Sequence, residues 1–138
     1  MGLDMNFYVA KKDFDEKAPN AGLSLEFGNE SYYFSKSAYP LHHWITSHVG
    51  KVEDCELKEV SRENILALRD TFIDILQNAT DGAKVTDVDY VKQRIWIFED
   101  KDVDFCFVGF IDRVIDVTNT LLYLTNFDTE KVLYCASW

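Results

Sequence analysis

The sequence SRENILALRDTFIDILQN, residues 61–78, has the clearest structural pattern in the chain. Its apolar residues recur every three or four positions, which predicts an amphipathic helix with one face against a core. Ser61 is a suitable N-cap, and Glu63 in the first turn favours a helix N-terminus at this point. The apolar stripe consists of Ile65, Leu68, Phe72, Ile75, Leu76 and Ala79.

Strand patterns lie on both sides of this helix. Residues 3–10 and 23–27 alternate apolar and polar side chains, and residues 132–138 form a further β-prone run at the end of the chain. Residues 41–49 predict a second helix, with Pro40 at its first turn and Gly50 at its end. Residues 51–60 are mostly polar and predict a loop.

The region after residue 80 gives a weaker pattern. Residues 93–98 and 104–110 are rich in β-prone side chains, and the charged residues 99–102 between them favour a turn, so we expect a hairpin. Apolar residues return to helical spacing from Phe110 to Leu124, and Asn126 is suited to end that helix. No βαβ rhythm is present. We therefore expect one α+β domain over residues 1–138, with a mainly antiparallel sheet, two or three helices, and the first and last strands central.

The composition restricts the class of protein. The chain has 138 residues with 47% apolar side chains, enough for one core, and its formal net charge is −10. This charge disfavours direct binding to nucleic acid or to anionic membranes, because phosphate recognition requires positive charge. No apolar run is long enough to span a bilayer, and the N-terminus lacks the pattern of a secretory signal. We expect a cytoplasmic protein with three free thiols.

Several short motifs, taken in order, resemble a family of small uncharacterised bacteriophage and prophage proteins. In that family a GLDMY opening precedes an E-x-x-Y-W-R-K segment, an H-x-W-F step, a D-C pair and a Y-x-A-S-W ending. This chain departs from the pattern at Phe34, Ser35 and Ile45, which stand for Trp, Arg and Phe. The resemblance implies a phage origin and a host cytoplasm, and it implies no activity. The matching positions are Gly2 to Met5, Glu30, Tyr33, Lys36, His42, Trp44, Asp54, Cys55, Ser61, and Tyr134 to Trp138.

The segment ESYYFSKSAYPLHHW, residues 30–44, contains the residues best suited to hold a small ligand. An aromatic ring can stack on a base and a lysine can meet a phosphate, so the segment could line a nucleotide pocket. The same residues could instead form a polar network at the edge of the core. Adjacent histidines diverge on a helix, which disfavours a metal site, and a Cys55–His42 thiol–imidazole pair is opposed by the neighbouring Asp54. The candidate ligand-binding residues are Glu30, Tyr33, Lys36, His42 and Trp44.

Carboxylates concentrate around the expected hairpin and are the candidate partner-binding residues. They are Asp87, Asp89, Asp100, Asp102 and Asp104, and their spacing lacks the glycine and the late glutamate of a calcium loop. We expect a small acidic binding protein that inhibits a host defence or nucleic-acid-processing protein by covering a basic surface. The alternative is a protein that binds or hydrolyses a nucleotide-like ligand. We expect no catalytic residues, metal or cofactor, and a homo-oligomer stays possible.

Overall fold

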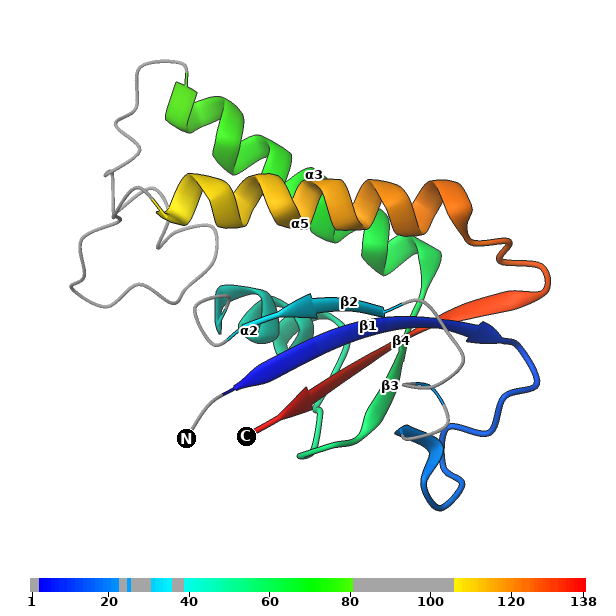
Figure 1. The fold of residues 1–138 in the computed structure, drawn as a ribbon. Helices are drawn as coiled ribbons and strands as arrows, with labels where there is room; N and C mark the ends of the chain where they lie inside the picture. Colours follow the sequence, from blue (N-terminus) through cyan, green and yellow to red (C-terminus); the bar gives the residue numbers. More distant parts are fainter. Residues whose placement is uncertain (1–2, 23–24, 26–30, 36–38, 81–105) are drawn as a thin grey trace.

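The computed structural model describes residues 3–22, 25, 31–35, 39–80 and 106–138. The chain forms an α+β fold, as the sequence predicts, with four antiparallel strands and three principal helices (Figure 1). In chain order the elements are β1 (Asp4–Lys11), β2 (Ser31–Phe34), α2 (Tyr39–His48), β3 (Leu57–Val60), α3 (Arg62–Thr80), α5 (Cys106–Leu124) and β4 (Glu130–Ser137).

The first and last strands lie side by side in the centre of the sheet. The strand order is β2-β1-β4-β3, and every neighbouring pair is antiparallel. β1 pairs with β4 along its whole length, from Asp4 opposite Ser137 to Lys11 opposite Glu130. The start of β1 and the end of β4 therefore meet at one end of the sheet (Figure 1). This central pairing confirms the sequence prediction and connects segments from the two ends of the described chain.

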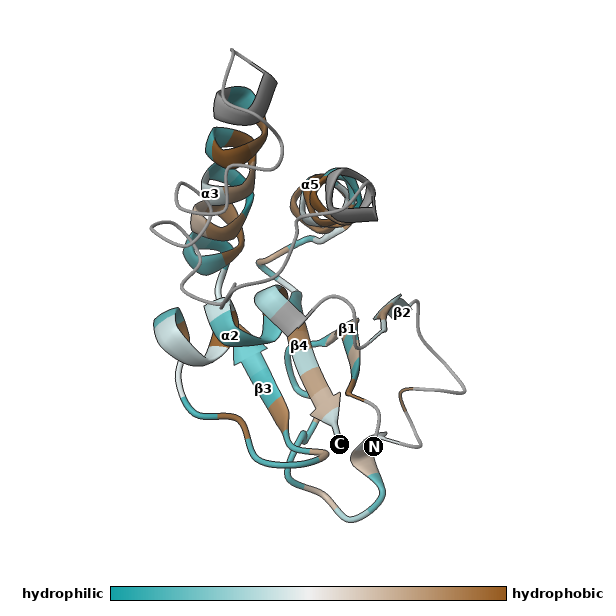
Figure 2. Cartoon of the chain, turned by 90° about the vertical axis from the view of Figure 1, so that its left-hand side faces the viewer, coloured by the Kyte–Doolittle hydropathy of each residue, from teal (hydrophilic) through white to brown (hydrophobic). Residues whose placement is uncertain are grey.

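The three helices cover one face of the sheet, which we call the helix face (Figures 1 and 2). The brown, apolar sides of α3 and α5 face one another in Figure 2. Because side chains alternate along a strand, every second residue of β1 and β4 enters this core. The buried core contains Met5, Phe7, Phe34, Trp44, Ile65, Leu68, Phe72, Ile111, Val114, Val132, Tyr134 and Ala136 among others.

The segment that follows β1 covers part of the other face. Ala21 and Leu25 from this segment pack with Tyr8 of β1 and Leu133 of β4 in a second, smaller apolar cluster. Lys131 fastens the segment to the sheet. Its ammonium donates to the Phe14 carbonyl and to the Glu16 carboxylate, both at 2.7 Å. This ion pair is largely shielded from water, and it lowers the pKa of the Glu16 carboxyl.

The helix ends follow the local chemistry of the sequence. The Ser61 hydroxyl accepts the Asn64 backbone N–H at 3.1 Å, so Ser61 caps α3 as predicted. After α2, the N–H groups of Val49 and Gly50 both donate to the Ile45 carbonyl. Gly50 has a φ of 142°, a conformation that side chains rarely adopt, so glycine suits the exit from α2.

Three predictions of secondary structure are wrong. Residues 57–60 form strand β3 rather than a loop, because Leu57 and Val60 supply buried side chains although the residues between them are polar. Residues 106–110 belong to α5 and not to the second strand of a hairpin, while residues 93–105 lie outside the described residues. Leu25, in the predicted strand 23–27, is helical and buried. A short apolar run fits a buried helix as well as a strand, which explains the error at 106–110.

Candidate functional site

The ligand-binding residues predicted from the sequence do not come together in the described structure. Trp44 is only 2% exposed and belongs to the core, and its ring stacks on His48 at 4.2 Å between centroids. Among the residues that the structure describes, its indole nitrogen has no hydrogen-bond partner. Trp44 therefore offers no open face to a ligand. Glu30 and Lys36 lie outside the described residues, as do all five predicted partner-binding aspartates at 87, 89, 100, 102 and 104.

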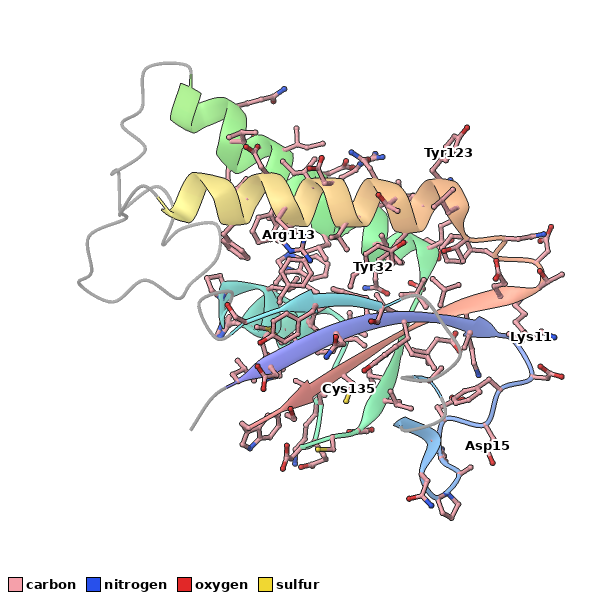
Figure 3. The ribbon with its side chains drawn as sticks, in the orientation of Figure 1. Lys11, Asp15, Tyr32, Arg113, Tyr123 and Cys135 are labelled. Atoms are coloured by element: carbon pink, nitrogen blue, oxygen red, sulfur yellow. The ribbon has the colours of Figure 1, made fainter. Side chains whose placement is uncertain are left out.

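Tyr33 and His42 lie on opposite faces of the sheet. Phe34 enters the core, so its neighbour Tyr33 points to the other face, where its hydroxyl donates to Asp4 at 2.6 Å. This hydrogen bond raises the pKa of the Tyr33 hydroxyl. On the helix side, the Arg113 guanidinium donates to the Tyr33 carbonyl at 2.9 Å and lies 5.1 Å from the Phe34 ring centroid (Figure 3). Tyr33 is thus held from two elements.

Residues from five separate segments meet where β1 begins and β4 ends. We call them the sheet-end cluster, and each carries part of the family resemblance described above. Tyr33 contacts Asp4, His42 contacts both Tyr134 and Trp138, and the Asp54–Cys55 turn contacts the last residues of β4. The pairing of Asp4 with Ser137 joins the two halves of the group. The sheet-end cluster comprises Asp4, Tyr33, His42, Asp54, Cys55, Tyr134 and Trp138.

His42 occupies the centre of this cluster. Its Nδ1 lies 2.7 Å from the hydroxyl of Tyr134, which is fully buried. Burial raises the pKa of Tyr134, so the hydroxyl keeps its proton, and the tautomer of His42 decides which of the two groups donates. Burial also lowers the pKa of His42, and the neighbouring His43 adds to this effect. His42 is therefore neutral near pH 7.

The Asp54–Cys55 turn closes over the end of β4. The Cys55 N–H donates to the Ala136 carbonyl at 2.8 Å, and Cys55 has a φ of 62°. Asp54 Oδ1 accepts the Trp138 backbone N–H at 2.9 Å and also faces the Cys55 thiol at 3.6 Å. Burial and the Asp54 charge raise the pKa of Cys55. Because the thiolate is the nucleophilic form, this environment opposes activation of Cys55, as the sequence indicates.

A cavity of about 400 Å³ lies beside the turn, between residues 16–22 and 55–57. Asn20 and Cys55, which both have a φ of 62°, line it. Its charged lining carries both signs, from Lys17 and from Glu16 and Glu56. This lining gives no preference for an anionic or a cationic ligand.

No group of three metal-binding side chains occurs among the described residues. Within the same part of the chain, every helix is too short or too polar to cross a bilayer. No family model, curated protein or solved structure matches this chain. The geometry of the sheet-end cluster is therefore the main guide to function.

The sequence predicted Tyr33 and His42 as candidate ligand-binding residues, but not Asp4, Tyr134 or Trp138. These three residues entered only as parts of the family motifs, at opposite ends of the chain. His42 and Tyr134 are 92 positions apart, so no local pattern could connect them. The signal that could have joined them was the expected central pairing of the first and last strands.

Proposed function

We propose that this chain is a binding protein that docks on a protein partner through the sheet-end cluster and covers a basic surface of that partner. The observation that carries the proposal is the exposure of two aromatic residues at one end of the sheet. Tyr33 is 49% exposed and Trp138 is 46% exposed. Trp138 packs on His42, so the two rings lie on opposite faces of the same sheet end, near the Asp4–Ser137 pair. Aromatic side chains of this kind supply much of the energy of protein interfaces.

The carboxylates around these aromatics support a basic partner. Asp4, Asp54 and Glu56 are all exposed next to or within the cluster, whereas Glu53 is paired with Lys51 at 2.9 Å. The whole chain carries a net charge of −10. Opposite charge on the partner would accelerate association, and salt would slow it steeply. The five aspartates between residues 87 and 104 would add to the same attraction.

The resemblance to phage proteins supports the kind of partner. Nucleic-acid-binding surfaces of host proteins are basic. Such a surface is therefore a suitable target for a small acidic protein made during infection. We therefore propose a host defence or nucleic-acid-processing protein as the partner. Inhibition would follow from occlusion of that surface and would require no chemical step.

Affinity capture from a bacterial lysate tests the proposal when variants are compared. The wild-type chain should retain a basic protein at low salt and release it at high salt. Trp138→Ala should lose that protein, and Tyr33→Ala should retain less of it. Tyr123→Ala is the matched control, because Tyr123 is 88% exposed on α5, away from the cluster (Figure 3).

Two results would contradict the proposal. Capture that is unaffected by salt would exclude the electrostatic part. Equal loss of the partner in Tyr123→Ala and Trp138→Ala would place the contact outside the sheet-end cluster. A nucleotide-like molecule retained by the wild type and lost in His42→Ala, with no protein partner, would favour the ligand-binding alternative instead.

A further inference from the structure

Trp138 presents an aromatic surface beside a carboxylate that the backbone holds in place. The indole is about half exposed, and the His42 ring lies 5.7 Å from it at an interplanar angle of 60°. The Asp54 carboxylate lies next to the same residue, with Oδ1 accepting the Trp138 N–H at 2.9 Å. An aromatic face, a second ring and an anionic group thus occur within one small surface.

The Asp54 carboxylate has capacity for another donor. The contacts of Asp54 with Trp138 and with the Cys55 thiol both use Oδ1. Within the described residues, Oδ2 has no hydrogen bond. A carboxylate oxygen accepts more than one hydrogen bond, so an incoming cation can pair with Asp54 without breaking its hold on Trp138.

The rings and the carboxylate favour the same type of ligand. The face of an indole attracts cations more strongly than the face of phenylalanine or tyrosine. His42 adds no positive charge, because its buried environment keeps it neutral. Guanidinium is planar, stacks on aromatic rings and pairs with carboxylates through two parallel hydrogen bonds, whereas ammonium acts as a compact charge. The chemistry therefore fits arginine better than lysine.

We infer that Trp138, His42 and Asp54 form a recognition site for an arginine side chain of the partner. This inference rests on the proposed function and deepens it, because it names the group that the basic partner supplies. Arginine is abundant on surfaces that bind nucleic acid, so the site would select the class of partner proposed above.

The test is an NMR titration of the full chain with N-acetyl-arginine methylamide at constant ionic strength. The indole N–H signal of Trp138, identified by its loss in Trp138→Phe, should show the largest shift and should saturate. N-acetyl-citrulline methylamide has a similar shape without the charge and should cause little shift. The corresponding lysine compound should bind more weakly than the arginine compound.

Asp54→Asn provides the matched perturbation. Asparagine keeps an oxygen for the Trp138 N–H, so the fold should persist while the charge is lost. Affinity for the arginine compound should fall about two- to fivefold, the range expected for one exposed ion pair. Asp128→Asn, at the other end of β4, should leave the affinity unchanged.

The inference is overturned if citrulline and arginine compounds shift the Trp138 signal equally. It is also overturned if Asp54→Asn and Asp128→Asn have the same affinity as the wild type. Loss of partner capture in Trp138→Ala together with a silent arginine titration would retain the docking surface and reject the arginine site. Arginine binding at Trp138 without any captured protein would retain the arginine site and reject the docking surface.

Discussion

Replacing Tyr134 by phenylalanine tests the contact that joins β4 to α2. The substitution removes one buried hydroxyl and leaves the ring, which packs against Phe7 at 5.2 Å between centroids. The lost interaction is the hydrogen bond to His42 Nδ1 at 2.7 Å. A typical intramolecular hydrogen bond contributes about 1 kcal/mol, and a fully buried acceptor left without a donor costs about 1–3 kcal/mol.

The size of the change in the free energy of unfolding depends on how far water can reach His42. His42 is only partly buried, so water can reach its Nδ1 once the hydroxyl is gone. We therefore expect the free energy of unfolding to fall by about 1 kcal/mol, at the low end of the range. For a chain of 138 residues this corresponds to a decrease in Tm of about 3–5 °C.

Urea denaturation at pH 8, where His42 is neutral in both states, measures the change. A double-mutant cycle with His42→Ala isolates the pair, and we expect a coupling energy of about 0.5–1.5 kcal/mol. Tyr123→Phe is the control, because Tyr123 is highly exposed and its change should stay within about 0.5 kcal/mol. Additivity of the two cluster substitutions would refute the reasoning, since the hydrogen bond would then make no net contribution.

Three further substitutions or conditions test other contacts. Lys131→Met should lower the free energy of unfolding by about 1–2 kcal/mol, because it leaves the Glu16 carboxylate and the Phe14 carbonyl unpaired; limited proteolysis should then cut residues 12–22 faster, and unchanged cutting would contradict the fastening role. Cys55→Gly should raise the free energy of unfolding by up to about 1 kcal/mol, because glycine accepts a φ of 62° without strain; urea denaturation checks this, and a decrease would contradict it. The pKa of His42 is lower in the folded state, so the unfolded state binds its proton first. Stability from this group should be complete above the ordinary value of 6.5 and lost as the pH falls below it; denaturation at pH 7.5 and 5.5 should show this loss in the wild type and a smaller one in His42→Asn, and equal losses would contradict the assignment.

The sequence predicted the parts of the fold in which local pattern and tertiary packing agree. In β1 Met5 and Phe7 alternate with residues of the other face and enter the main core, and α3 carries one stripe against that core. Strand β3 was missed because an edge strand of four residues needs only two buried side chains. The start of α5 was missed because a short apolar run suits a helix as well as a strand.

The candidate site was less predictable for a physical reason. Its contacts join residues separated by 29 positions in Tyr33–Asp4, 84 in Trp138–Asp54 and 92 in His42–Tyr134. The periodicity of apolar residues in the sequence does not indicate such contacts, because they depend on the pairing of β1 with β4. Of the described members of the predicted pocket, Trp44 is part of the core, and His42 is hydrogen-bonded to Tyr134 of β4.

The sheet-end cluster contains buried and exposed residues, and we expect these two kinds to have different roles. Tyr134 is fully buried and bonded to His42, so its substitution should act mainly on the stability of the fold. Trp138 and Tyr33 keep nearly half of their surface in water, so folding buries only part of each side chain. Under the proposed function a partner would bury the remainder, and the adjacent carboxylates would favour a positively charged partner. Tyr134 is bonded to His42, on which Trp138 packs, and a ring held in this way would lose less entropy on docking.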